Sequence, residues 1–562
     1  MFCAVKYKTM ENKSFIADIE QSIIKHWGRP ALSDYKSGPI TFSQVGERIA
    51  RLHILFEQCG IQQGDHIAIC GRNCSAWAIS FFAILSYGAI AVPLLHEFKP
   101  QQVEHLVNHS DCKFAILGDI VWEGVDADNF FDVNAVLLMQ GFQLVYCKNT
   151  KYQQAFDNLQ KLFKKKYPNG FSVKNVKYRR EKPNDLALIN YTSGTTSASK
   201  GVMIPYRALI GNQIFADRVI TDLNEYSNSI CMLPMAHMYG MSYELITEFR
   251  RGTHIHFLSR IPSPKVVAQA LAEVKPDIII SVPLIIEKIY KTKLKPFLDK
   301  RLTKTLLRIP SIDKMLLTRI QRELHTAFGE NFYEVIIGGA AMNQEVEAFL
   351  KKIGFRYTIG YGMTECAPII CYADWKETKV GSCGKAVDEM EVKIDSPDPT
   401  NIPGEILTRG VNVMLGYYKN EEETHKVLQD GWLHTGDLGI MDKDGYVFIK
   451  GRKKNMILSS NGQNIYPEEL EDKLNSMEYV NEALVIEKEG KITALVNLDY
   501  DKLDRDGVGR DSYNVILEQI RKDTNAELPA YEQIAQIFNQ AEEFEKTPKR
   551  SIKRYMYSHK GL

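Results

Sequence analysis

The chain has 562 residues, a length that suggests roughly three or four domain-sized units and allows large buried cores. Hydrophobic residues make up 44% and charged residues 25% of the sequence, as in ordinary globular proteins. Since 70 basic and 69 acidic residues leave a net charge of +1, the charge balance indicates no nucleic-acid partner.

The cysteines and the N-terminus indicate a reducing compartment. The ten cysteines are scattered, and the nearest approach to a metal-ligand pair, Cys70 and Cys74, lacks the second half of any zinc pattern. Residues 1–13 carry charges and have no long apolar core with a cleavage site, so we expect no secretory signal. These features predict free thiols in a cytoplasmic protein.

Helices and short apolar strands alternate up to residue 191, which predicts a layered α/β domain. The first clear helix begins after Thr41, an N-cap candidate, and closes at Gly60. Residues 147–182 are rich in lysine and irregular, and we expect a solvated connector there.

Residues 73–95 contain no charged side chain and are long enough for a membrane span. Gly88 and Pro93 interrupt this stretch, however, and strand patterns border it at residues 66–70 and 89–95. We therefore predict a strand, a buried helix and a second strand instead of a membrane span.

A loop with the sequence YTSGTTSASKG spans residues 191–201, between the apolar runs 186–190 and 202–205. Glycine lets a backbone turn its N–H groups inward, while hydroxyls add donors and lysine adds charge, so such a loop can wrap a phosphate. It is not a Walker A loop, because serine stands where that motif needs glycine before its lysine. The alternative is a solvated turn. The candidate phosphate contacts are Thr192, Ser193, Gly194, Thr195, Thr196 and Lys200.

This loop resembles the YTSGTTGxPKG signature of the adenylate-forming superfamily, which contains acyl-CoA synthetases, luciferases and peptide-synthetase adenylation domains. Ser197 and Ser199 replace the usual glycine and proline. Further motifs follow in the family's order, and the resemblance covers residues 41–555. It implies an α/β fold with a large multi-layer N-terminal domain and a smaller, mobile α+β C-terminal domain.

Two segments between the loop and the later motifs concern the acid substrate. The segment LPMAHMYG contains His237, and the resemblance implies that this histidine borders an acyl pocket; a packed core histidine is the alternative. Residues 290–326 are basic and leucine-rich at helical spacing, which predicts an amphipathic helix. This insertion resembles the long-chain fatty acyl-CoA synthetase branch, and its basic face suggests peripheral contact with the inner face of a membrane.

The next two motifs form the remainder of the predicted nucleotide site. The small residues Gly338, Gly339 and Ala340 would let a flat base lie against the backbone. In the motif GYGMTE, at residues 360–365, the resemblance implies that Tyr361 lines the adenine and that Gly362 belongs to the same nucleotide site. It also implies that Thr364 contacts the α-phosphate and that Glu365 holds Mg²⁺, a cation that a carboxylate beside a triphosphate requires.

The motifs GWLHTGD and GRKK imply ribose contacts and a hinge. Asp437 would accept hydrogen bonds from the ribose hydroxyls, and Arg452 would reach the ribose and phosphate. The resemblance places the hinge at Lys454, which divides the chain into an AMP-binding domain at residues 1–453 and a C-terminal domain at 454–562. Gly462, in the linker motif that follows, is expected to contact coenzyme A.

The C-terminus departs from the family. Members end near a PTGKIxR-like motif whose lysine contacts the reacting carboxylate and α-phosphate, but this chain has Ser551 at that place. Lys549 and Lys553 each lie two positions away, about 7 Å along an extended segment, and either is a candidate substitute.

The resemblance implies that the protein uses ATP and Mg²⁺ to convert a medium- to long-chain fatty acid into an acyl-adenylate, and then coenzyme A to form the thioester. One alternative keeps the adenylate but transfers the acyl group to an acyl carrier protein. Another, motivated by Ser197, Ser199 and Ser551, is a nucleotide-binding regulator without catalysis. The sequence leaves acyl-chain length and oligomeric state open.

Overall fold

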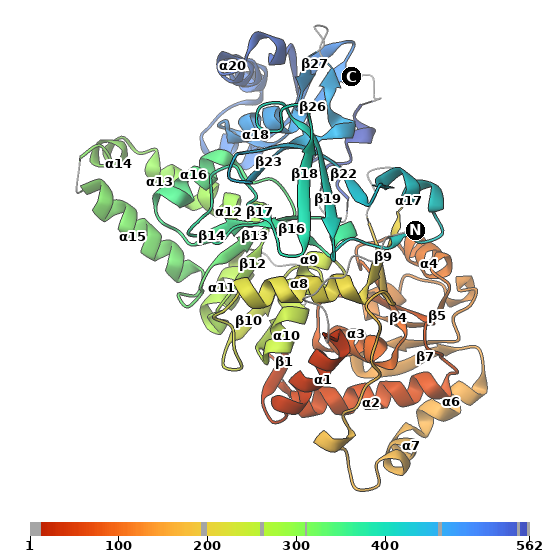
Figure 1. Ribbon diagram of the computed structural model, residues 1–562. Helices are drawn as coiled ribbons and strands as arrows, with labels where there is room; N and C mark the ends of the chain where they lie inside the picture. Colours follow the sequence, from red (N-terminus) through yellow and green to blue (C-terminus); the bar gives the residue numbers. More distant parts are fainter. Residues whose placement is uncertain are drawn as a thin grey trace.

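The computed structural model describes residues 13–192, 199–258, 264–309, 312–458, 463–547 and 551–558. In Figure 1 the N-terminal region, coloured red to yellow, lies at the bottom, and the green middle region extends to the left. The C-terminal region, in blue, lies at the top. The predicted architecture, a large α/β domain with a smaller α+β domain, is confirmed.

An eight-stranded sheet in the order β20–β9–β8–β4–β3–β5–β6–β7 forms the centre of the N-terminal region. Strands β4, β3, β5 and β6 are parallel, while β9 pairs antiparallel with both β8 and β20. The strands are β3 (His66–Cys70), β4 (Ile90–Leu94), β5 (Cys112–Leu117), β6 (Ala135–Leu138), β7 (Gln143–Cys147), β8 (Leu186–Tyr191), β9 (Gly201–Pro205) and β20 (Gly416–Tyr417).

The uncharged stretch forms the predicted strand, helix and strand. Helix α3 (Ser75–Tyr87) connects β3 to β4 and is buried over almost its whole length. It ends at Gly88, whose φ of 89° is in the left-handed region that glycine adopts without strain. None of the described helices combines the length and the apolar character needed to cross a bilayer.

The lysine-rich stretch after β7 is more ordered than the sequence suggests. Residues 150–166 form α6 (Thr150–Asp157) and α7 (Leu159–Lys166) instead of an irregular connector. Phe163 of α7 packs against Ala50 and Ile54 of α2 (Phe42–Gln58). The three contiguous lysines occupy the last turn of α7, where positive charge favours the helix dipole.

A second core lies in the middle region, between a three-stranded parallel sheet and the helices around it. The predicted amphipathic helix at residues 290–326 is divided into several described helices, of which the longest, α15, has 16 residues and buries Ile320 and Leu324. The elements are α11 (Pro264–Val274), β12 (Ile279–Ser281), α12 (Pro283–Ile289), α13 (Lys295–Leu298), α14 (Arg301–Leu306), α15 (Ile312–Ala327), β13 (Val335–Ile337), α16 (Gln344–Lys352) and β14 (Tyr357–Ile359).

The remaining sheets connect this core to the C-terminal domain. An antiparallel sheet joins β18 (Met390–Asp395), β19 (Gly404–Gly410), β21 (Leu428–Gln429), β22 (Trp432–Met441) and β23 (Val447–Arg452). Beyond it, three strands carry α18 and α20. These last elements are α18 (Pro467–Ser476), β26 (Val480–Lys488), β27 (Lys491–Leu498), α20 (Tyr513–Ala526) and β28 (Gln536–Asn539).

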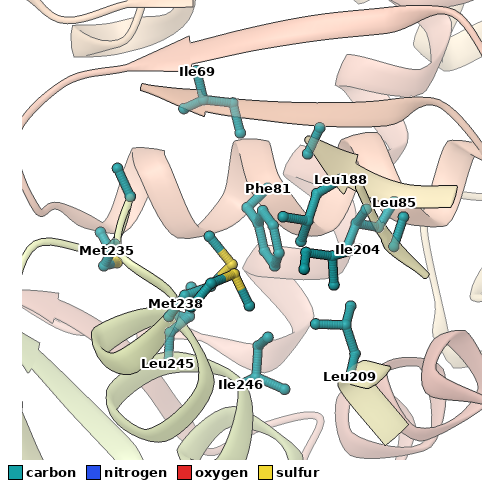
Figure 2. Close-up of a cluster of buried hydrophobic side chains, with 14 of the residues drawn as sticks. Ile69, Phe81, Leu85, Leu188, Ile204, Leu209, Met235, Met238, Leu245 and Ile246 are labelled. Carbon is teal, nitrogen blue, oxygen red and sulfur yellow. The ribbon is translucent and has the colours of Figure 1, made fainter. Parts of the chain in front are cut away.

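The main hydrophobic core reaches directly under the segment that contains His237. Figure 2 shows Met235 and Met238 pointing into the same apolar cluster as Phe81 of α3, Leu188 of β8 and Ile204 of β9. Both methionines are at most 2% exposed. Close packing of this kind fixes the backbone between them, so the core determines where His237 stands.

Candidate active site

A cleft of about 3370 Å³ separates the N-terminal sheets from the C-terminal domain. It brings together residues from widely separated parts of the sequence, as expected for a nucleotide site built on loops after strands. The predicted site residues that line it, with Ser551, are Thr192, Lys200, His237, Gly339, Ala340, Tyr361, Gly362, Thr364, Glu365, Asp437, Arg452, Lys454, Ser551 and Lys553.

Other predicted residues do not line the described cleft. Gly338 is buried at the end of β13, and a Cβ atom there would meet the ring of Tyr239 at 3.1 Å. The lack of a side chain at Gly338 thus allows the ring of Tyr239 to pack closely, and the contact of an adenine with its backbone stays a prediction. The residues Ser193, Gly194, Thr195, Thr196, Gly462 and Lys549 lie outside the described part of the chain.

Glu365 stands in a short 3₁₀ turn after β15 (Tyr361–Gly362) and is 8% exposed. Its Oε1 accepts a hydrogen bond of 2.9 Å from the hydroxyl of Tyr417. Burial and the neighbouring Glu365 carboxylate raise the pKa of this phenol, so it remains a donor at any physiological pH. Tyr417 was not predicted, and it orients Glu365 within the cleft.

Glu365 is not part of a cluster of metal-binding side chains among the described residues. In the described residues there is no group of three or more His, Cys, Asp or Glu side chains that could bind a metal ion. A lone buried carboxylate instead fits Mg²⁺, which is usually bound by one or two carboxylates together with phosphate oxygens and water. The donor set at Glu365 therefore matches a cation that arrives with a polyphosphate.

The side of the cleft where ribose contacts are predicted is built around a buried carboxylate. Asp437 is 5% exposed. Its Oδ2 accepts a hydrogen bond of 2.6 Å from the Tyr361 hydroxyl, and its Oδ1 lies 2.7 Å from Nε of Arg452. The antiparallel pairing of β22 with β23 puts Asp437 directly opposite Arg452. Burial raises the pKa of Asp437, and the charge of Arg452 opposes that rise. Tyr361 thus orients the carboxylate as well as lining the cleft.

An apolar part of the cleft borders His237. This residue is the N-cap of α9 (Met238–Gly240), and its amide donates 2.9 Å to the carbonyl of Pro234. The Tyr239 hydroxyl donates a hydrogen bond of 3.0 Å to the carbonyl of Ile336, which connects α9 to the neighbouring sheet. Apolar residues that line the same cleft include Met232, Leu258, Val282, Pro283 and Ile285.

The C-terminal hairpin places one predicted lysine at the cleft. An isolated antiparallel bridge pairs Lys546 with Ile552, so Ser551 and Lys553 lie on the same face of the segment. Nζ of Lys553 is 3.5 Å from the carboxylate of Glu545. Arg554 forms an ion pair with Glu471, whose pKa burial raises to about 7, and this pair fixes the base of the hairpin.

Two models of known protein families match this chain. The model of the AMP-binding enzyme family matches residues 19–418, and that of the AMP-binding enzyme C-terminal domain matches residues 454–560. The chain belongs to the AMP-binding enzyme family.

Curated relatives cover most of this chain. A long-chain-fatty-acid–CoA ligase of Escherichia coli O157:H7 is 27% identical over 482 residues, which is 82% of this chain and 80% of that protein. Long chain acyl-CoA synthetase 5 of Arabidopsis thaliana is 27% identical over 530 residues, or 85% of this chain and 76% of that protein.

Solved structures show the same fold at lower identity. The o-succinylbenzoate CoA synthetase of Bacillus subtilis, in complex with its acyl-adenylate intermediate, has a TM-score of 0.75 at 20% identity and covers 98% of this chain and 99% of its own. ATP-bound MatB of Rhodopseudomonas palustris has a TM-score of 0.75 at 20% identity, with 96% and 98% covered.

We predict that Asp437→Ala weakens AMP binding about 10- to 100-fold, the range for losing a hydrogen bond to a charged group. Isothermal titration with AMP measures this. Tyr361→Phe is the matched control: it removes one donor to Asp437 and keeps the carboxylate, so its effect should be several times smaller. Equal losses in both variants would contradict a direct role of Asp437 in nucleotide binding.

Proposed function

We propose that this family member is an AMP-forming acid–CoA ligase that activates a medium- to long-chain fatty acid. The observation that carries the proposal is the single cleft in which Glu365 and Lys200, the Asp437–Arg452 pair and the apolar lining beside His237 meet. The names of the curated relatives support a fatty acid. MatB and the o-succinylbenzoate enzyme have other names and share only the fold.

In the proposed first step a carboxylate oxygen of the fatty acid attacks the α-phosphorus of ATP. The bond between that phosphorus and the bridging oxygen breaks, and pyrophosphate leaves. No protein nucleophile is required, so the residues act by position and charge. Thr364 lies at the α-phosphate, Lys200 faces the outer phosphates, and Asp437 holds the ribose. Magnesium bound at Glu365 would neutralise phosphate charge.

In the second step the thiolate of coenzyme A attacks the carbonyl carbon of the acyl-adenylate. The carbon–oxygen bond to the phosphate breaks, AMP leaves, and the thiol proton passes to solvent. The apolar lining near His237 would exclude water from the mixed anhydride, which protects it from hydrolysis.

Fatty-acid-dependent release of pyrophosphate from ATP tests the proposal, with thioester formation from coenzyme A or acyl carrier protein measured by mass spectrometry. We predict that Glu365→Gln lowers pyrophosphate release at limiting magnesium about 100-fold or more, because the cation loses its anionic ligand. Unfolding curves of both proteins serve as the control for structure. A wild-type protein that binds ATP without releasing pyrophosphate would be a regulator, and the proposed reaction would be excluded.

We further propose that residues 454–562 rotate as a unit about Lys454 between the two steps. Lys454 lies in a 3₁₀ turn (Lys453–Asn455) directly after β23, between the last N-terminal sheet and the C-terminal strands. A few torsions at the boundary of an element are enough for such a rotation. Hydrogen bonds from Lys291 and Asn343 to α18 would be exchanged as the domain turns.

We predict that Lys454→Pro, which fixes φ near about −65°, preserves one half-reaction and abolishes the other. Adenylate formation is followed by pyrophosphate release, and thioester formation is followed from supplied acyl-adenylate. Lys454→Ala removes the same side chain but leaves the torsions free, so it separates the backbone effect from the loss of charge. Parallel losses of both half-reactions in Lys454→Pro would argue against a hinge there.

The lysine that assists adenylation is proposed to be Lys553. It lies on the same face as Ser551, lines the cleft and is paired with an exposed glutamate that it can release. A lysine stem is long and flexible enough to recover part of the displacement along the strand.

We predict that Lys553→Ala slows adenylate formation about 10²–10³-fold, the scale for losing one preorganised contact to developing charge. Thioester formation from supplied acyl-adenylate should hardly change. Lys549→Ala is the matched control and should have a much smaller effect. If Lys549→Ala slows adenylate formation and Lys553→Ala does not, Lys549 is the assisting lysine. If neither variant slows it, neither lysine assists.

We also propose that α14 and α15 touch an anionic bilayer. Both helices lie at the outer edge of the molecule in Figure 1, and Leu302 and Met315 are 71% and 69% exposed. Residues 290–326 contain ten lysines and arginines but three acidic residues, in a protein whose net charge is +1. Among the described residues, neither Arg301 nor Lys314 forms an ion pair. Exposed apolar side chains beside basic ones are typical of interfacial helices.

We predict that replacing both Leu302 and Met315 by glutamate reduces co-sedimentation with vesicles of phosphatidylglycerol and phosphatidylcholine at least about tenfold, because insertion of two apolar side chains is lost. Vesicles of phosphatidylcholine alone should bind the wild type weakly. Val515→Glu, at another site that is 70% exposed, is the control. Undiminished binding of the double variant would exclude this surface.

A further inference from the structure

Lys200 closes the phosphate loop, and its ammonium group has a carboxylate partner in this structure. It forms an ion pair with Oε2 of Glu423 and lies 5.0 Å from the centre of the Tyr417 ring. Lys200 and Glu423 are each 30% exposed, so solvent does not fully screen the pair. The same tyrosine donates its hydroxyl to Glu365, which links this pair to the proposed magnesium ligand.

The fold holds Glu423 firmly beside the loop. Strand β20 pairs with β9, the strand that begins directly after Lys200, and α17 (Glu421–Val427) follows β20. The hydroxyl of Thr424, in α17, accepts a hydrogen bond of 2.8 Å from the Tyr417 amide. Thr424 also packs against Gly416, where a Cβ atom would approach it to 2.7 Å. The distance between Glu423 and Lys200 is thus set by backbone pairing.

We propose that Glu423 is an internal counter-ion that occupies Lys200 until a triphosphate displaces it. This inference rests on the proposed function, in which Lys200 binds the outer phosphates of ATP. Glu423 is a positioning residue in this scheme, because it acts on the nucleotide only through Lys200.

The exchange leaves neither side without a partner. A triphosphate carries more charge than one carboxylate and competes for the same ammonium group. Oε1 of Glu423 is 2.8 Å from Nζ of Lys426, so the carboxylate keeps this second cation after Lys200 has turned away. The pair with Lys200 lowers the pKa of Glu423 to about 2, and the carboxylate is therefore ionised throughout the working range of pH.

Titration of the full-length protein with ATP and with AMP tests the inference. In Glu423→Gln the competing charge is gone, and we expect ATP to bind about two- to fivefold more tightly, the range for one partly exposed ion pair. AMP lacks the two outer phosphates, and its affinity should not change. Calorimetry at two salt concentrations should show the gain shrinking as salt rises.

Glu422→Gln is a matched control, because Glu422 precedes Glu423 on α17 and also pairs with Lys426, at 2.7 Å, but does not pair with Lys200. It removes the same charge and should leave ATP affinity unchanged. In a Lys200→Met background, Glu423→Gln should likewise have no effect, because the residue through which it acts is absent.

Three results would overturn the inference. They are an equal gain in Glu422→Gln, unchanged ATP affinity in Glu423→Gln, and weaker ATP binding in Glu423→Gln, which would make Glu423 a support that aims Lys200 at the phosphate. A wild-type protein that fails to bind ATP would instead contradict the proposed function itself, so the two failures are distinguishable.

Discussion

The pairing of β20 with β9 is the constraint on which the end of the cleft with Lys200 and Glu365 depends. It joins the strand that follows the phosphate loop to a segment more than 200 residues later. Through this ladder Tyr417 reaches Glu365, and Glu423 reaches Lys200. The main core lies beneath, where side chains of β8, β9 and α3 interlock (Figure 2). Burial of apolar side chains therefore fixes the positions of groups that are themselves charged.

The buried carboxylate of Asp437 is stabilised by an ion pair and a hydrogen bond. An isolated carboxylate in the interior is expensive, but Asp437 faces Arg452 across a strand pair and accepts a hydrogen bond from Tyr361. With both oxygens held, the carboxylate has a fixed orientation. Such preorganisation favours recognition of a ligand with two adjacent hydroxyls, because little reorganisation is required when it binds.

Much of the fold could be predicted from local patterns, while contacts between distant segments could not. Alternation of apolar runs with glycine and proline gave β3, α3 and β4 correctly. The prediction of an irregular connector was wrong for α6 and α7, because the high lysine content outweighed the few apolar residues that pack on α2. The predicted long helix is interrupted at Lys300, whose ψ of 133° is not helical and which precedes α14.

In the site, too, local motifs could be predicted and contacts between distant segments could not. Asp437 and Arg452, which the resemblance assigned to one site, are brought together by the antiparallel pairing of β22 with β23. The partners Tyr417 and Glu423 have no such signal, since the residues that they contact lie far away in the chain. The ring of Tyr239 packs against Gly338, and sequence spacing gave no indication of this contact. Motifs thus identify which residues carry charge into the cleft, and packing decides what those residues face.

Charge pairing in the described cleft makes binding of a polyanion an exchange of partners rather than simple attraction. Lys200 is paired with Glu423, Arg452 with Asp437 and Lys553 with Glu545. An anion that enters gains a cation only when a carboxylate gives it up, so favourable and unfavourable Coulomb terms largely cancel. Discrimination then depends on how many pairs one ligand can replace at once. Under the proposed reaction a nucleotide triphosphate with an acid beside it would replace several of these pairs, whereas a small anion would replace a single pair and gain little.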